Sequence, residues 1–362
     1  MTADDLAQAL RAAVLAQHFD ATADSLQGGA PLGVMPSIDL AVVVFGARPV
    51  AANVLFSREH PQGLVAHVNG VNGAVDNAAF HADVRDAVGD SYAWLPGADW
   101  SRIAFPAWFG TGPRFVAPYP ASLLKTMVAV GIARLVDQGR SDWALPLAHA
   151  GETRAVADWL HDMIIVSSNE ATSALVAHLH ARGAIRREGG REVHNELHAL
   201  FAAHGLPGLM IANTQPDGGW GNGAGSGVGQ IQMTAWDALR LMWRLDADAP
   251  PLPELVSPAG RAVIRRALDA QTLHHNLSSE SLRALPGWVQ GIPCPPATFA
   301  HKTGNTQNYG SDAGIVHDGG LHYLIAVTTS LGSRYAPHAD AATTWKLPAL
   351  GGAVHAWLKA NA

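Results

Sequence analysis

The chain has 362 residues, of which 48% are hydrophobic and 15% charged, so it can bury the core of one large domain or of two lobes. Its formal net charge of −6 gives no basis for a nucleic-acid-binding or polybasic membrane surface. The one cysteine, Cys294, excludes an intrachain disulfide and a cysteine-based zinc site.

The first residues predict an amphipathic helix rather than a secretory signal. Asp4 and Asp5 stand where a signal would carry positive charge, and Thr2 with Asp5 forms an approximate capping box. No stretch approaches the roughly 20 uninterrupted apolar residues of a membrane-spanning helix. The expected localisation is cytoplasmic if the chain is complete, and periplasmic or secreted if a leader has been removed.

Two strands are predicted at 37–45 and 50–56, joined by a short turn. The segment 57–112 shows no clear periodicity and predicts an insertion of irregular structure. Packing is the commoner role of a tryptophan, but the insertion holds the better candidates for the wall of a substrate pocket, which are Trp94, Trp100 and Trp108.

The segment 121–250 predicts a mainly helical lobe. Within it, the glycine-dense stretch 213–230 must form a long loop, and a loop of this length is usually functional or mobile. The segment 257–362 predicts a helix, a strand at 299–304, a hairpin turning at Asp318 and Gly319, and a final helix. Segments 1–56 and 257–362 are therefore expected to form one α/β lobe.

Lysine is scarce in this chain, which has 20 arginines and only four lysines: Lys125, Lys302, Lys346 and Lys359. A GC-rich coding bias would explain the imbalance without any functional cause. Arginine cannot lose its proton in a protein, however, whereas a buried lysine shifts its pKa readily. Each lysine therefore marks a position where an amine could be required.

Ser122 and Lys125 form an S-x-x-K motif at a predicted helix start. The i,i+3 spacing predicts that the two side chains lie within hydrogen-bond reach, where a neutral amine could take the hydroxyl proton. The motif occurs about once by chance in a chain of this length, so a helix cap and a surface charge are the alternative. Two more short motifs favour the chemical interpretation, because "SSN" at 167–169 and "KTG" at 302–304 follow in order.

The ordered motifs "SLLK", "SSN" and "KTG" resemble those of the penicillin-recognising serine hydrolases, which include class A β-lactamases and D-alanyl-D-alanine peptidases. The resemblance covers roughly residues 115–335 plus the terminal helices. It implies an α/β (α+β) fold with an antiparallel five-stranded sheet flanked by the terminal helices, an all-helical lobe, and a site between the two.

The resemblance also implies a role for each motif residue. Ser122 would attack a carbonyl to form an acyl-enzyme, Lys125 would activate it, and Ser167 would relay a proton to the leaving nitrogen. The backbone N–H groups of Ser122 and Asn305 would form the oxyanion hole. The remaining substrate-binding residues would be Asn169 for an amide side chain, Lys302 and Thr303 for a carboxylate, and Gly304 for close approach of the strand.

The chain departs from the class A pattern where the omega-loop glutamate that drives deacylation should stand. No glutamate occurs between Ala212 and Thr234, and Asp217 is the only carboxylate there. Asp217 is a candidate deacylation base, although a turn residue before glycine is the simpler interpretation. Three outcomes stay open: deacylation by the Ser-Lys machinery as in D-alanyl-D-alanine carboxypeptidases, a slow-deacylating β-lactam-binding sensor, or a different ester or amide substrate.

No cofactor and no metal are expected, and the expected partner is a small-molecule or peptide substrate. The "HNELH" stretch at 194–198 has an i,i+4 histidine pair, but its order differs from the metalloprotease motif, and a solvated helix face is the simpler interpretation. His301 is expected to face outward from its strand, with tuning of the charge near Lys302 as the alternative.

Overall fold

The computed structural model describes residues 1–362 apart from 71–72, 86–90, 93–94, 294, 296 and 336–344. Trp94 and Cys294 therefore lie outside the described residues. None of the described helices is both long enough and apolar enough to cross a bilayer.

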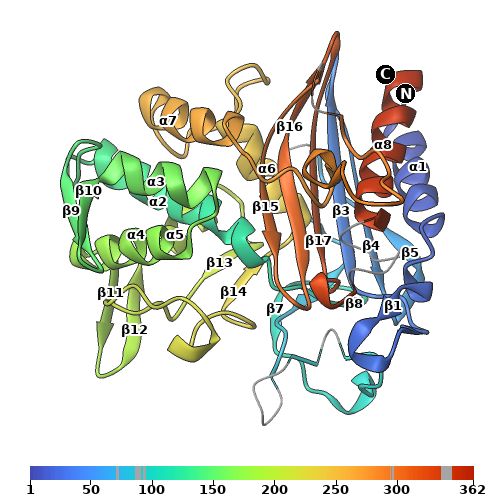
Figure 1. The fold of residues 1–362 in the computed structure, drawn as a ribbon, viewed down its shortest axis with the longest axis horizontal. Coiled ribbons are helices and arrows are strands. Elements are labelled where there is room, and N and C mark those ends of the chain that lie inside the picture. Colours follow the sequence, from blue (N-terminus) through green and yellow to red (C-terminus); the bar gives the residue numbers. More distant parts are fainter. Residues whose placement is uncertain (71–72, 86–90, 93–94, 294, 296, 336–344) are drawn as a thin grey trace.

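An antiparallel sheet with the strand order β15-β16-β17-β3-β4-β5 forms the centre of the fold (Figure 1). Its strands are β3 (Ile38–Phe45), β4 (Val50–Ser57), β5 (His60–Ala66), β15 (Thr298–Asn305), β16 (Gly310–Asp318) and β17 (Leu321–Thr329). β17 pairs with β3, so both ends of the chain build one sheet. The predicted strands and hairpin are confirmed, and the sheet has six strands rather than five because β5 extends it.

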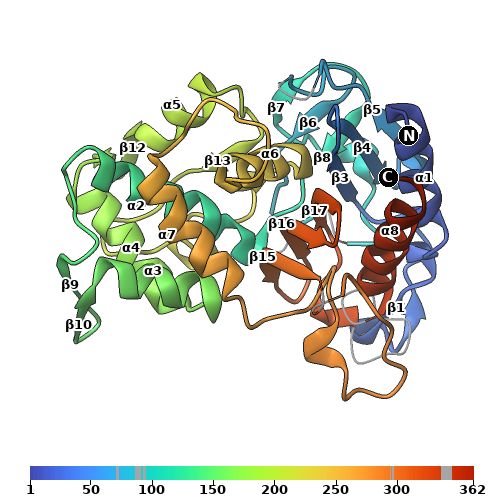
Figure 2. The ribbon, with the colours of Figure 1, turned by 90° about the horizontal axis from the view of Figure 1, so that it is seen from above.

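Helices cover both faces of this sheet. α1 (Ala3–Leu15) and α8 (Leu347–Asn361) lie side by side on the outer face, as Figure 2 shows from above. α6 (Ala235–Leu245) packs on the inner face against β3, β16 and β17. Successive residues of β3 therefore enter different cores, with Val42 on the α1 and α8 side and Val43 on the α6 side.

The capping box predicted at the start of α1 is present. The Thr2 hydroxyl accepts from the Asp5 N–H at 3.1 Å, and the Thr2 N–H donates to the Asp5 carboxylate at 2.8 Å. Both bonds lie within one turn, which explains why the sequence alone was sufficient to predict them.

A second lobe, mostly helical, lies beside the sheet (Figures 1 and 2). Its helices are α2 (Lys125–Asp137), α3 (Val156–Ile165), α4 (Asn169–Ala181), α5 (Glu196–Ala203) and α7 (Pro258–Asp269). It is not all-helical, because it also contains the hairpins β9 (Pro146–His149) with β10 (Glu152–Ala155), β11 (Ile185–Glu188) with β12 (Arg191–Asn195), and β13 (Leu209–Ile211) with β14 (Ile231–Met233). α7 packs against α2 and α3 as well as β15, and so joins the two lobes.

The insertion is more regular than expected. Besides β5 it holds β6 (Ala79–His81) and β7 (Ala107–Gly110), which form a small sheet with β8 (Arg114–Val116) just after the insertion. A separate short pair, β1 (Ala23–Asp24) with β2 (Ala30–Pro31), precedes β3. Trp100 is buried in a small core with Phe105 and Val116, beneath the Arg58 guanidinium at 4.7 Å from its ring. Trp100 is therefore a packing residue rather than a pocket wall, and Trp108 is partly buried against Phe109.

Candidate active site

Ser122 lies in a short 3-10 turn, Ala121–Leu124, that leads directly into α2 at Lys125. This turn, which we call the nucleophile turn, packs against β15 and β16. Ala121 has a φ of +49°, a left-handed conformation that an alanine seldom adopts, immediately before the serine. Ser122 is partly exposed, whereas Leu123 and Leu124 after it are buried.

Gly304 allows β15 to lie directly against the nucleophile turn. A Cβ at this position would come 2.8 Å from the Leu123 backbone nitrogen, and closer still to the Pro120 carbonyl oxygen and Ser311 Oγ. The Ser311 hydroxyl donates to that same Pro120 carbonyl. The glycine was expected to let the strand approach a substrate; it lets the strand approach the turn that carries Ser122.

The three motifs meet at one hydroxyl group. The Lys125 amine donates to Ser167 O at 2.6 Å, Ser167 Oγ at 3.0 Å and Asn169 Oδ1 at 2.9 Å. The Lys302 amine donates to the same Ser167 Oγ at 3.0 Å and to Thr303 O at 2.8 Å. Because Ser167 has a φ of +57°, both its carbonyl and its hydroxyl reach Lys125.

Both lysines are fully buried. Burial lowers the pKa of the Lys125 amine to about 7. Burial, followed by the neighbouring Lys125 cation, lowers the pKa of Lys302 well below its ordinary value, and Asp312 opposes this effect. Burial, and not the charge of the neighbouring Lys302, causes the pKa shift of Lys125. An amine of this kind is available as a base near neutral pH.

The Ser122 hydroxyl makes no hydrogen bond to Lys125 within the described part of the chain, although the i,i+3 spacing predicts that reach. The three oxygens bonded to Lys125 satisfy the three donors of an ammonium group, and they come from the junction of α3 and α4. The position of the amine is therefore set by contacts distant in sequence. Loss of one proton frees a lone pair on the same nitrogen.

Asn305 is exposed at the end of β15, whereas Thr303 is buried. Sequence reasoning missed Asn276, whose side-chain amide donates to Gly304 O at 3.2 Å and to Ser311 O at 2.8 Å. It holds the ends of β15 and β16 beside the nucleophile turn. Only its positive φ of 66° distinguishes it, and that is a property of the folded chain.

The prediction that His301 faces outward was wrong. His301 and Asp312 are fully buried and joined at 2.8 Å, and the other ring nitrogen of His301 lies 3.1 Å from His274. The segment around His274 covers this face of β15, because the Gln271 amide donates to His301 O and the Leu277 N–H to Asp312. The prediction assumed that this face of β15 is exposed to solvent, but the segment around His274 covers it.

The glycine-rich loop places an aromatic ring, and not a carboxylate, near the lysines. The Lys125 amine lies 5.8 Å from the centre of the Trp220 ring. Asp217 is exposed, and its carboxylate accepts from the Gly219 N–H at 3.0 Å, as in an Asx turn. Arg85 of the insertion holds the far side of this loop by donating to Ser226 O at 2.7 Å. Sequence reasoning singled out the glycines of this loop and missed Trp220.

We expect Asp217→Asn to leave the rate of acyl-enzyme release within about twofold of wild type. An asparagine side chain keeps the turn bond to Gly219, and the exposed carboxylate contacts none of Lys125, Ser167 and Lys302 in the described residues. The release rate after a pulse of penicillin, followed by intact mass, is the measurement. A tenfold or greater slowing would instead identify Asp217 as the deacylation base.

The "HNELH" histidines do not form a zinc pair. His194 lies on β12, Asn195 caps α5, and His198 lies on the helix, so the two rings do not share one helix face. The Nε2 of His198 accepts from the Ile211 N–H at 3.1 Å and is already occupied.

Comparison with known proteins agrees with this fold and identifies a family. Residues 116–346 match the model of the β-lactamase enzyme family. The fold is similar to that of a PBP-A mutant solved as an acyl-enzyme with penicillin G, at 15% identity and a TM-score of 0.55 over 99% of this chain and 97% of that one. It is also similar to the TLA-1 extended-spectrum β-lactamase, at 13% identity and a TM-score of 0.55 over 97% of this chain and 99% of that one.

A search of curated protein sequences found no significant match. The structural similarities, all at low identity, concern the fold alone, whereas the family match covers most of the chain. The chain belongs to the β-lactamase enzyme family, within the penicillin-recognising serine hydrolases.

Proposed function

We propose that this protein is a serine hydrolase whose Ser122 is acylated by an amide, lactam or ester that carries a nearby carboxylate. One observation carries the proposal: Lys125 is a buried amine with a pKa of about 7, one residue past the nucleophile turn, and it shares the Ser167 hydroxyl with Lys302. A serine hydroxyl needs such a neighbour to accept its proton.

The proposed reaction uses these groups in sequence. Ser122 Oγ bonds to the carbonyl carbon while its proton passes to the neutral Lys125 amine, and the backbone N–H groups of Ser122 and Asn305 stabilise the oxyanion. As the carbon–nitrogen or carbon–oxygen bond breaks, Ser167 gives its proton to the leaving atom and regains one from a lysine. Water then cleaves the ester to release the acid and restore Ser122.

The substrate would be held by the groups around this hydroxyl. Asn169, which is exposed at the start of α4, would bind an amide side chain of the substrate. Lys302 and Thr303 would bind its carboxylate, displacing part of their present buried contacts. These assignments follow from the family resemblance and from the shared Ser167.

A second candidate function is slow release, as in a β-lactam-binding sensor or a D-alanyl-D-alanine carboxypeptidase-like peptidase. No carboxylate bonds to Lys125, Ser167 or Lys302 in the described residues, and Asp217 caps its own turn. Deacylation would then depend on the same lysines as acylation. We therefore expect its acyl-enzyme to have a longer lifetime than the acyl-enzyme of a β-lactamase with fast turnover.

The test is intact mass after mixing with penicillin G, followed over time, in wild type and Ser122→Ala. We expect one adduct per wild-type chain and none in the variant, while the exposed Ser101→Ala control is acylated like wild type. A transient adduct with released product identifies a hydrolase, and a persistent one identifies the slow-release protein. An adduct that survives Ser122→Ala would overturn the assignment of the nucleophile.

A further inference from the structure

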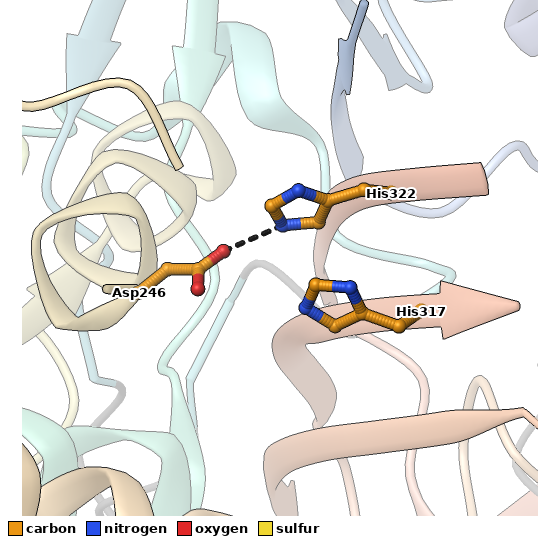
Figure 3. A group of neighbouring side chains, drawn as sticks. All are labelled: Asp246, His317 and His322. Carbon is orange, nitrogen blue, oxygen red and sulfur yellow. Dashed lines mark hydrogen bonds and ion pairs between the residues drawn. The ribbon is translucent and has the colours of Figure 1, made fainter. Parts of the chain in front are cut away.

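Asp246, His317 and His322 come together beside the turn between β16 and β17 (Figure 3). Asp246 follows the last residue of α6, while His317 and His322 lie opposite each other on β16 and β17. One ligand atom of each residue, a carboxylate oxygen or an imidazole nitrogen, lies within 4.8 Å of the other two. Figure 3 shows both imidazole rings directed toward the carboxylate.

The ring nitrogen of His317 lacks a partner. The Nε2 atom of His317 is buried and forms no hydrogen bond within the described residues. The nearest carboxylate oxygen, on Asp248, is 3.8 Å away. The Nε2 of His322, by contrast, is 2.7 Å from Asp246 Oδ2. A buried nitrogen left without a partner costs free energy, so a ligand that bonds to it would stabilise the fold.

The surrounding residues hold these donors in place. Arg265 Nη1 donates to the other oxygen of Asp246 at 3.1 Å, and the Asp248 N–H donates to that oxygen at 3.2 Å. The two imidazole rings stack with their centres 4.0 Å apart, and the Phe45 ring lies 4.5 Å from that of His322. Groups of this kind orient the ligands of a metal site.

The charge of the cluster suits a divalent cation. Three carboxylates, Asp246, Asp248 and Asp269, surround one cation, Arg265, which bonds to both Asp246 and Asp269. With neutral imidazoles, three negative charges and one positive charge leave a local charge of −2. A divalent ion would neutralise this charge.

We propose that Asp246, His317 and His322 bind one divalent first-row transition metal ion, best matched by Zn²⁺, with Asp248 as the fourth ligand. Imidazole nitrogen and carboxylate oxygen are zinc ligands, and bonds of about 2.0–2.1 Å place tetrahedral donors about 3.3 Å apart. The widest pair must therefore close by at most about 1.5 Å. Binding of the ion at His322 Nε2 replaces the hydrogen bond between this ring and Asp246, and the neutral ring then carries its proton on Nδ1.

Such a site would be structural rather than catalytic. Along β16, Ser311 contacts the nucleophile turn and His317 lies six residues further on, about 20 Å at roughly 3.3 Å per residue. The ion would join the end of α6 to the β16–β17 hairpin. The inference is independent of the proposed function at Ser122.

The test is zinc binding by the whole chain after chelator treatment, with metal content measured after equilibrium dialysis against ZnCl₂. We expect one zinc per wild-type chain, at least tenfold weaker binding in His317→Ala, and wild-type binding in the control His161→Ala, whose ring is exposed on α3. At a hundred-fold excess over the dissociation constant, zinc should raise the thermal midpoint by about 3–4 °C.

His317→Ala suits this test because it removes a ring nitrogen that has no hydrogen-bond partner in the described residues. Co²⁺ in place of zinc gives a readout on the wild-type chain itself, namely intense visible absorption from a tetrahedral site. Absence of stoichiometric zinc and of this absorption, or equal loss in His161→Ala, would overturn the proposal. Penicillin acylation should be unchanged by zinc and by His317→Ala, so the two proposals fail separately.

Discussion

Lys125→Arg is expected to reduce the rate of Ser122 acylation by about a thousandfold or more while keeping a cation at this position. Arginine cannot be deprotonated in a protein, so it cannot take the serine proton, and general-base catalysis contributes about 10²–10⁴-fold. The measurement is the second-order rate of adduct formation with penicillin G. Near-wild-type acylation would refute a general-base role for this amine.

The matched control is Lys359→Arg, a change at an exposed lysine that pairs with Asp318 on the surface. Lys359→Arg should be acylated at the wild-type rate. The thermal midpoint of each variant should also be measured, because a buried arginine at position 125 could destabilise the fold. A second readout is the pH profile of the wild type. Because burial lowers the pKa of Lys125 to about 7, acylation should rise with pH through that value and level off above it, where the amine is neutral.

Gly304→Ala is expected to slow the acylation of Ser122 by about a hundredfold or more. It should also lower the free energy of unfolding by about 1–3 kcal/mol. The added Cβ would lie 2.8 Å from the Leu123 nitrogen and would also meet the Pro120 carbonyl, so β15 and the nucleophile turn must move apart. That movement separates Ser122 from Asn305, which together would form the oxyanion hole. The adduct rate and the thermal midpoint are the two measurements.

Gly46→Ala provides the control, since a Cβ at Gly46 would meet nothing within 4 Å. It should change neither acylation nor the thermal midpoint appreciably. Acylation at the wild-type rate in Gly304→Ala would show that the contact between β15 and the nucleophile turn is not needed for the reaction.

Features within a few residues of one another could be predicted from the sequence. The Thr2–Asp5 capping box, the hairpin at Gly319 and the existence of helix α2 depend on contacts within one or two turns, so their residue types are sufficient to indicate them. The α-helix starts at Lys125, later than the predicted start at Ser122, because a 3-10 turn precedes it. The order of the three motifs likewise led to the family. The small hairpins were missed because their strands are short, and β5 was missed because Pro61 and Gly63 interrupt its pattern.

The contacts within the site could not be predicted from the sequence, because they depend on how the chain folds. Nothing in the i,i+3 spacing indicates that Lys125 bonds to Ser167 and Asn169 rather than to Ser122. Trp220 beside Lys125 is also a contact between segments nearly a hundred positions apart. Both depend on how the α3–α4 junction and the glycine-rich loop pack around α2.

By itself the sequence determined which residue types can perform the chemistry and in which order they occur, because a hydroxyl or an amine has the same capability in any chain. The tertiary structure decided the pKa values of these groups and which of them lie close together. Burial, which brings the pKa of Lys125 to about 7, and the meeting of Asp246, His317 and His322 both arise from packing between distant segments. Low polarity and donor geometry are properties of a folded interior, and short-range patterns do not encode them.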